Sequence, residues 1–339
     1  MLSHWSYPVE EQRIEGLPPM SLALGTFDGV HRGHVGVLQA SVALSHRFPG
    51  SLPVALTFEP PPWSILQSGR DPHFLTPLPE KVHRLLDHGV NRVYAFRFDR
   101  FLASLEPKDF IRDVLLRFPL TGVAVGFNFS FGRKRSGGVG DLVKGLAGKV
   151  PVTIVPPVCQ QGYVTSSTRL RCLLSQGRVA AARRLLGRFY VLEGLVVRGE
   201  QRGRLLGFPT ANLEMELPFQ WPAHGVYAVL VGYRGGRWPG VLHCGPQPTF
   251  SGSQRRLEVH IVGFSGNLYG ERLRVEFVGF LRPIHTFPSS SDLMQQIEED
   301  IRCTRSILGR FPGLHLPTEY RTMAAACDDR RAGHRKNQR

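Results

Sequence analysis

The feature that most constrains the fold is a change of hydrophobic periodicity at about residue 188. Before it, short apolar runs alternate with amphipathic stretches, which predicts a parallel sheet covered by helices. After it, apolar runs follow one another between glycine- and proline-rich turns, which predicts an antiparallel barrel or sandwich. A length of 339 residues also suits two hydrophobic cores better than one.

We therefore predict an α/β domain over residues 1–187 and an antiparallel β domain over residues 188–318. In the first domain, Val35, Leu38 and Val42 share one face of an expected helix. In the second, the closing helix carries an apolar stripe that we assign to core packing. The stripe consists of Leu293, Ile297, Ile301 and Leu308. Residues 319–339 form a basic tail that we expect to be disordered.

We expect neither a secretory signal nor a membrane span. No apolar run approaches the roughly 18 residues that a span requires, and the N-terminal stretch carries Glu10 and Glu11 in place of an apolar segment. The five cysteines include no Cys-x-x-Cys pair, so we expect small buried side chains, not a disulfide framework or a zinc site. The expected location is the cytoplasm.

A net charge of +15 first suggests a nucleic-acid partner. The charge could equally come from a general arginine bias with a basic tail, or serve a set of phosphate-bearing substrates. No helix-turn-helix, zinc-finger or aromatic stacking motif supports the nucleic-acid hypothesis. We therefore expect no specific nucleic-acid or membrane partner, and a monomer or weak oligomer.

A first candidate site is the segment GTFDGVHRGH at residues 25–34, where an apolar strand passes into a helix. Free amides at such a turn favour phosphate. His31 and His34 are three residues apart, so we expect them to share a face on one turn of the helix, where both can donate hydrogen bonds to a phosphate that gains charge during nucleophilic attack. The alternatives are a surface loop with incidental histidines and a zinc site, which would need a third ligand.

Two further segments belong to the first domain. In SSTRLR, residues 166–171, three hydroxyls at a helix start and Arg171 suggest an anion site, although N-capping explains one hydroxyl. Asn128 follows an expected strand and precedes a basic glycine loop. This loop could hold a flat aromatic ring and its phosphate.

In the second domain, the stretch GRLLGFPTAN occupies residues 203–212. Its glycines can wrap phosphates, and Thr210 and Asn212 are oxygen donors on one side of an extended segment, which suits Mg²⁺. Glu258 lies on the polar face of an alternating strand and could act as a general base. A simple turn and a solvent-facing glutamate are the alternatives.

Together these segments resemble the bacterial bifunctional riboflavin kinase/FMN adenylyltransferase family, from about Leu22 to Leu308. The matching segments also include VGFNFSFGRKRSG, GVYAV, QPTF, LEVHI, LYG and FLRP. The resemblance implies a Rossmann-like nucleotidyltransferase domain that makes FAD from FMN and ATP. It also implies a β-barrel flavokinase domain with a C-terminal helix that makes FMN from riboflavin and ATP.

The resemblance further implies roles for individual residues. His31 and His34 would stabilise adenylyl transfer, and Glu258 would activate the riboflavin 5′-hydroxyl. Asn128 would contact flavin, and Thr210 and Asn212 would bind Mg²⁺. The residues expected around ATP and its phosphates are Gly25, Phe27, Asp28, Gly33, Ser167, Thr168, Arg171, Gly203 and Gly207.

Three features depart from the family pattern, and one of them is the basic tail beyond the family-like region. Pro61 stands where the family usually has a histidine, which raises the alternative of a riboflavin kinase with weak or lost adenylyltransferase activity. His243 and Cys244 replace the usual Asn-Ile before a glycine, inside the expected kinase pocket.

Overall fold

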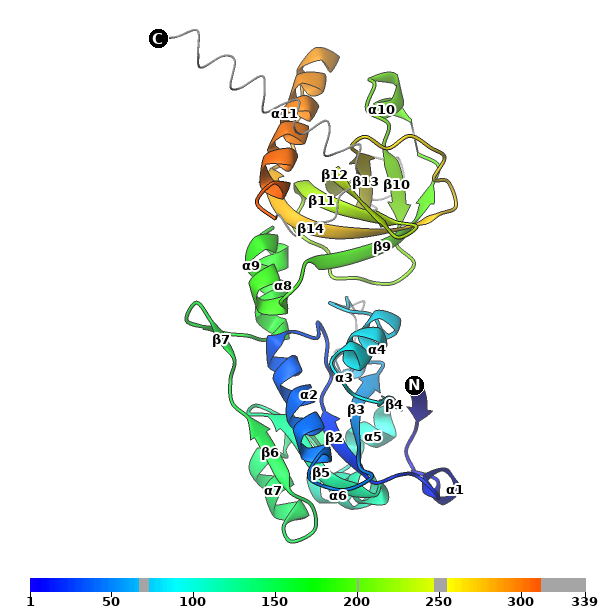
Figure 1. The fold of residues 1–339 in the computed structure, drawn as a ribbon, viewed down its shortest axis with the longest axis vertical. Coiled ribbons are helices and arrows are strands. Elements are labelled where there is room, and N and C mark those ends of the chain that lie inside the picture. Colours follow the sequence, from blue (N-terminus) through cyan, green and yellow to red (C-terminus); the bar gives the residue numbers. More distant parts are fainter. Residues whose placement is uncertain (67–72, 200, 247–254, 312–339) are drawn as a thin grey trace. The chain divides into compact units, whose positions relative to one another are not determined.

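The structure is a computed structural model that describes residues 1–66, 73–199, 201–246 and 255–311 (Figure 1). It divides into two compact units. The first comprises Met1–Leu170 and Leu185–Gly187; the second comprises Arg171–Arg184 and the chain from Arg188 onward. The predicted tail and the QPTF segment lie outside the described residues. Within the described residues, no helix combines the length and the apolar character needed to cross a membrane.

The first unit is built on a six-stranded parallel sheet with the order β1-β4-β3-β2-β5-β6. Its strands are β1 (Leu2–Trp5), β2 (Met20–Leu24), β3 (Leu52–Glu59), β4 (Arg92–Arg97), β5 (Leu120–Gly126) and β6 (Val152–Val155). The predicted α/β architecture is confirmed. The sequence analysis missed the edge strand β1, whose four residues pair with β4.

Helices cover both faces of this sheet (Figure 1). On one face α2 (Arg32–Ser45) and α4 (Leu78–Asp87) pack over small strand residues such as Ala23 and Ala55. The other face carries larger apolar side chains beneath α5 (Arg100–Ser104), α6 (Pro107–Asp113) and α7 (Val139–Leu146). The other elements before residue 188 are α1 (Glu11–Ile14), α3 (Pro62–Leu66), η1 (Leu115–Arg117), η2 (Arg133–Arg135), β7 (Cys159–Gln160), β8 (Tyr163–Val164), α8 (Ser167–Ser175) and α9 (Val179–Leu186), and most of α8 and α9 belongs to the second unit.

The buried face of α2 differs from the predicted one. Leu38 is fully buried, but Val35 and Val42 are only partly buried. The fully buried positions also include Ser41, whose hydroxyl donates to the carbonyl of Ser21 on β2 at 2.9 Å. The helix can bury a serine because the sheet supplies its partner, a contact that an apolar pattern does not reveal.

The second unit is a closed antiparallel barrel with the order β10-β13-β12-β11-β14-β9, so the barrel alternative of the prediction is confirmed. Its strands are β9 (Tyr190–Val197), β10 (Ala211–Glu214), β11 (Gly225–Tyr233), β12 (Gly236–Pro246), β13 (Arg255–Ile261) and β14 (Arg272–Arg282). Leu257 and Val259 are fully buried on one face of β13, while Glu258 and His260 occupy the other face. Closure pairs each of these strands on both sides.

Helix α11 (Ser290–Leu308) packs against β11, β12 and β14 (Figure 1). Leu308 is buried as predicted, but Leu293, Ile297 and Ile301 are only partly buried. The helix instead buries Asp300, which receives three hydrogen bonds of 2.8–3.1 Å from the Arg282 guanidinium. An ion pair therefore anchors the helix where the sequence suggested an apolar stripe alone.

The cysteines correct another prediction. Of the four within the described residues, Cys244 is buried, Cys159 is exposed, and Cys172 and Cys303 are partly exposed. Cys244 lies on β12 with its side chain on the inner face of the barrel. Its neighbour His243 therefore lies on the outer face.

Candidate active sites

The two histidines of the first candidate site stack on each other. Their ring centroids are 3.6 Å apart and their planes differ by 14°. His31 is the N-cap of α2, not a residue of its first turn as predicted, and its Nδ1 accepts the backbone N–H of His34 at 3.3 Å. Because Nδ1 is the acceptor, the proton of the neutral ring lies on Nε2.

Gly33 and Phe27 pack directly against the two stacked histidine rings. A Cβ at Gly33 would lie 3.2 Å from the His31 ring, so any larger residue would crowd the stack. Phe27 is buried and meets the His34 ring edge-on at 5.3 Å. The same phenyl ring lies 3.3 Å from the Cβ position of Gly25. The loop therefore closes around the histidine pair.

Asp28 joins this loop to two other segments. Its carboxylate accepts the backbone N–H groups of Leu75 and Thr76 at 3.0 and 3.1 Å. Its carbonyl oxygen accepts the Ser167 hydroxyl at 2.8 Å. The predicted first and second segments, nearly 140 residues apart, are thus directly bonded.

The SSTRLR segment forms the start of α8. Ser166 caps the helix by accepting the N–H of Arg169 at 3.2 Å, so the capping alternative holds for this hydroxyl. Thr168 is exposed, and Arg171 lies one turn further along, partly buried. Asn128 follows the carboxyl end of β5 and is exposed. Since β5 pairs in parallel with β2, Asn128 and Gly25 lie at the same edge of the sheet.

In the barrel, Asn212 is 6% exposed. Within the described part of the chain its Oδ1 has no hydrogen-bond partner. A Cβ added to Gly199 would lie only 2.2 Å from Nδ2 of Asn212, so the Asn212 amide fills the space beside this glycine. A buried amide oxygen without a partner in the described residues could accept a hydrogen bond from a ligand or bind a hard cation.

Glu258 is the direct cross-strand partner of Asn212. On its other side it pairs with His243 of β12. The three side chains therefore share the outer face of the barrel. Burial lowers the pKa of His243, the Glu258 carboxylate raises it again, and Arg282 and His224 lower it further.

The loop before β10 folds back on itself. It contains a short helix, α10 (Arg202–Leu205), where the sequence suggested only a glycine-rich loop. Gly203 accepts the N–H of Phe208 at 2.8 Å, and its Cβ position lies 3.3 Å from the Thr210 hydroxyl. Gly207 has a φ of +84°, which only glycine adopts without strain.

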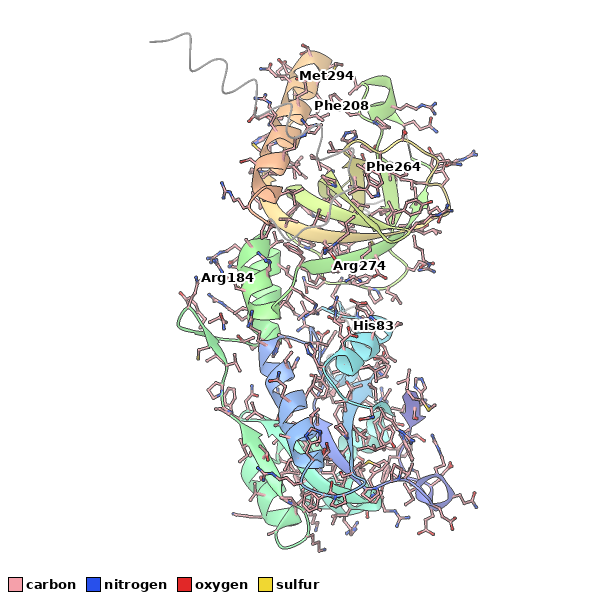
Figure 2. All side chains as sticks on the ribbon, viewed as in Figure 1. His83, Arg184, Phe208, Phe264, Arg274 and Met294 are labelled. Atoms are coloured by element: carbon pink, nitrogen blue, oxygen red, sulfur yellow. The ribbon has the colours of Figure 1, made fainter. Side chains whose placement is uncertain are left out.

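His260 ties this loop to the barrel. One ring nitrogen, Nδ1, lies 2.9 Å from the carbonyl oxygen of Pro209. The His260 ring packs edge-on against Phe208, with the ring centroids 5.7 Å apart (Phe208 in Figure 2). Burial lowers the pKa of His260. The loop that carries Thr210 is thus fastened to the strand that carries Glu258.

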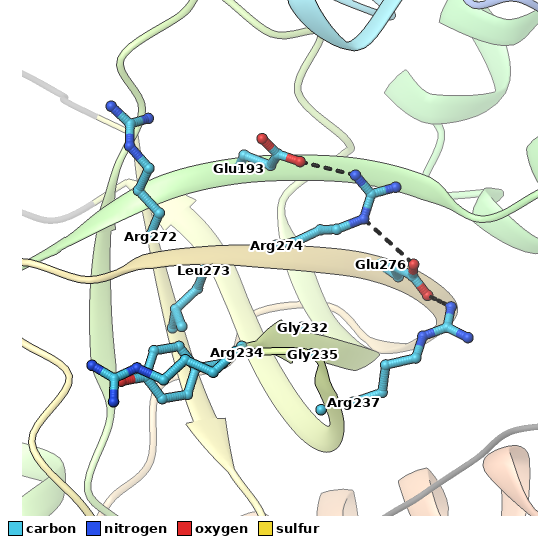
Figure 3. Close-up of a pocket in the computed structure, with 11 residues that line it drawn as sticks. Glu193, Gly232, Arg234, Gly235, Arg237, Arg272, Leu273, Arg274 and Glu276 are labelled. Atoms are coloured by element: carbon cyan, nitrogen blue, oxygen red, sulfur yellow. Dashed lines mark hydrogen bonds and ion pairs between the residues drawn. The ribbon is translucent and has the colours of Figure 1, made fainter. Parts of the chain in front are cut away.

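A surface cavity of about 410 Å³ lies elsewhere on the barrel, at the turn between β11 and β12 (Figure 3). None of the predicted site residues lines it. Its charged side chains form ion pairs. Arg274 binds Glu193 at 2.9 Å and Arg237 binds Glu276 within the lining. Arg234 and Arg272 bind Glu271 and Glu216, which lie outside the lining. The cavity is therefore an ion-pair surface and not part of either candidate site.

Comparison with known proteins defines the class of these domains. Residues 14–169 match the FAD synthetase family and residues 186–308 match the riboflavin kinase family. The chain is 34% identical to the bifunctional riboflavin kinase/FMN adenylyltransferase of Listeria monocytogenes, covering 86% of this chain and 93% of that protein. It is 36% identical to the Escherichia coli protein of the same name, over 85% and 92% of the two chains.

The chain therefore belongs to the bifunctional riboflavin kinase/FMN adenylyltransferase family. It phosphorylates riboflavin and joins the resulting FMN to AMP, with ATP as co-substrate of both reactions. Both domains are present, so the bifunctional interpretation holds over that of a kinase alone. A Streptococcus pneumoniae crystal structure described as a macrolide-efflux protein has the same fold, with a TM-score of 0.81, 29% identity and coverage of 89% and 98%.

Sequence reasoning missed one ion pair and one buried cation. Asp300 and Arg282 form the ion pair described above. Lys81 on α4 is 1% exposed and interacts electrostatically with Asp28 and Glu59. A signal was present, since Lys81 is four residues before the buried Leu85 and thus on the inward face of the helix.

Proposed function

We propose that the two reactions are divided between residues 1–187 and 188–318. The first domain transfers the adenylyl group of ATP to FMN and releases pyrophosphate. The second transfers the γ-phosphoryl group of ATP to riboflavin and releases ADP. The observation that supports the kinase assignment is the cross-strand pairing of Asn212, the proposed cation ligand, with Glu258, the proposed base.

In adenylyl transfer, a phosphate oxygen of FMN attacks the α-phosphorus of ATP as pyrophosphate leaves. His31 donates from Nε2 to the oxygens that gain charge, and His34 supports the stack. Ser167, Thr168, Arg171 and the glycines Gly25 and Gly33 surround the ATP phosphates, with Phe27 and Asp28 shaping the loop. Asn128 contacts the flavin from the carboxyl end of β5.

In the kinase reaction, the riboflavin 5′-hydroxyl oxygen attacks the γ-phosphorus while the Glu258 carboxylate takes its proton. Gly203 and Gly207 allow the loop to approach the phosphates. Thr210 and Asn212 would hold Mg²⁺, and the orphaned Oδ1 of Asn212 fits this role. Bound Mg²⁺ neutralises charge on the phosphates during transfer.

The assay that tests this proposal supplies purified protein with riboflavin, ATP and Mg²⁺ and separates the flavins over time. We expect FMN to appear first and FAD to follow. Supplying FMN in place of riboflavin isolates the second step. Accumulation of FMN with no FAD would contradict the role of the first domain, despite its matching residues.

We further propose that the basic charge serves phosphate substrates and no specific nucleic acid. Some of the arginines are held in ion pairs, for example Arg133 with Glu106 and Arg117 with Glu11. Titrating a labelled oligonucleotide with salt tests this, because a nucleic-acid protein would bind tightly and with a steep salt dependence. A monomer or weak oligomer in the cytoplasm completes the proposal, with light scattering as the test of size.

A further inference from the structure

Five residues on the outer face of the barrel form one continuous row across its strands. Asn212 on β10 pairs with Glu258 on β13, and Glu258 pairs with His243 on β12. His243 pairs in turn with Val226 on β11, which pairs with Arg282 on β14. Directly paired residues point to the same face of a sheet, with about 4.5–5.5 Å between neighbouring Cβ atoms. His243 is therefore the neighbour of Glu258 on the side away from Asn212.

The two ends of this row differ in character. At one end, Asn212 follows the glycine loop to which we assign the ATP phosphates. At the other end, Arg282 binds Asp300 of α11 at 2.8 Å. Glu258 and His243 lie between these ends and are only partly buried. Both side chains can therefore contact a molecule bound on this face.

The His243 ring lies against the backbone of its own strand. A Cβ added to Gly245 would lie 2.9 Å from Cε1 and 3.4 Å from Nε2 of the ring. The side chain of Ile284 reaches into the same space above Gly245. Gly245 therefore leaves room for the imidazole, and Ile284 limits where it can move.

The His243 imidazole offers both a hydrogen-bond donor and an acceptor. Burial lowers the pKa of His243, so the ring is neutral at pH 7. A neutral imidazole donates through one nitrogen and accepts through the other. An alcohol hydroxyl likewise donates and accepts, so it is a complementary partner for this ring.

We propose that His243 binds the ribityl chain of riboflavin, at the 4′-hydroxyl next to the 5′-hydroxyl that is phosphorylated. Phosphoryl transfer places the leaving group and the attacking oxygen roughly in line, on opposite sides of the transferred group. With the ATP phosphates at Asn212 and the 5′-hydroxyl at Glu258, the rest of the acceptor extends toward His243. His243 is thus a specificity residue that takes no part in proton transfer. The inference rests on the proposed function of Asn212 and Glu258.

The test compares riboflavin with 4′-deoxyriboflavin, which lacks only this hydroxyl, as kinase substrates of the full chain. We expect the wild-type kcat/KM to be about tenfold lower for the analogue, because one hydrogen bond is lost. His243→Ala should raise the KM for riboflavin about tenfold and leave kcat and the KM for ATP within twofold. This variant should use the two flavins equally well, since the partner of the 4′-hydroxyl is gone.

Two further variants separate substrate recognition from general damage. His243→Asn retains a donor and an acceptor, so it should keep the preference for riboflavin and a KM close to that of the wild type. Leu217→Ala removes a side chain that is 42% exposed in the same unit and should change neither quantity. A purely structural role of His243 would slow the reaction of both flavins alike and leave the preference between them intact.

A tenfold preference for riboflavin that persists in His243→Ala would overturn the proposal. So would a wild type that uses both flavins equally, and this result decides the matter even if His243→Ala does not fold. Failure of the proposed function is distinguishable, because Glu258→Gln would then still make FMN. Loss of FMN formation in Glu258→Gln, together with an unchanged preference in His243→Ala, would refute the role of His243 alone.

Discussion

Asn212 and Glu258 face each other directly across the pairing of β10 with β13, on the outer face of the barrel. One has a buried amide oxygen without a partner in the described structure, and the other has a carboxylate within the same row of side chains. The chain brings these residues together from positions 46 apart in sequence. A cation and a proton acceptor at adjacent positions suit the attack of a hydroxyl on a phosphate.

Glu258→Gln should stop FMN formation and spare FAD formation. The amide keeps the shape of the side chain but cannot take the proton, so we expect kcat for the kinase to fall by about 10²–10⁴-fold. FAD formation from supplied FMN is the internal control and should change less than twofold. Loss of both activities in a folded protein would show that the sites are not separate.

His31→Ala should give the reverse pattern. The substitution removes the Nε2 donor and the stack on His34, and we expect FAD formation to fall about 10²–10³-fold. Riboflavin phosphorylation should continue at the wild-type rate. His83→Ala, at an exposed site on α4, is the matched control and should leave both rates unchanged. A variant that still made FAD at near wild-type rate would exclude His31 from transition-state stabilisation.

Asn212→Ala should raise the Mg²⁺ concentration needed for half-maximal kinase activity. Losing one of few protein ligands weakens a cation that keeps most of its waters, so we expect about a tenfold increase. Asn267→Ala, in an exposed loop of the same domain, should leave the Mg²⁺ requirement unchanged. Equal Mg²⁺ dependence in the wild type and Asn212→Ala would remove Asn212 from the cation site.

The barrel should lose stability in mild acid. The pKa values of His243 and His260 lie below the ordinary 6.5 in the folded state, so the unfolded chain binds more protons once the pH falls below about 6.5. The two histidines make their full contribution to the free energy of unfolding above this pH. That contribution is lost as the pH falls toward the folded-state pKa values. Melting curves from pH 8 to pH 5 measure the effect.

His243→Asn should reduce this acid sensitivity. The amide does not titrate, so its share of the pH dependence disappears, while neighbouring Glu258, Arg282 and His224 remain. It also introduces the residue usual in the resembling family. If the melting temperature of the variant falls with pH as steeply as that of the wild type, His243 is not a source of the acid sensitivity.

Asp300→Ala should destabilise the barrel by about 3–5 kcal/mol, since it leaves the Arg282 guanidinium without its buried partner. Asp292→Ala, on the exposed first turn of the same helix, is expected to cost only about 0.3–1 kcal/mol for the lost acidic side chain at the helix N-terminus, because its backbone N–H still reaches the capping Ser289. Chemical denaturation compares the two. Equal losses would mean that the ion pair does not anchor α11.

Local sequence patterns were sufficient for the architecture and for the segments that carry the sites. The alternation of Leu257, Glu258 and Val259 gave the correct faces of β13, because a strand alternates its side chains whatever its neighbours are. The same local reasoning placed His31 inside a helix, although it caps that helix. Helix ends depend on individual hydrogen bonds, which a periodicity does not specify.

By itself, the sequence determined the two fold classes, the change between them near residue 188, and the candidate segments. Periodicity and turn residues act over a few neighbours, so they can be read along the chain. Only the tertiary structure decided that Asn212 faces Glu258, that Asp28 bonds to Ser167, and that Lys81 is buried. These contacts depend on strand register and on packing between segments distant in sequence, and no local pattern contains that information.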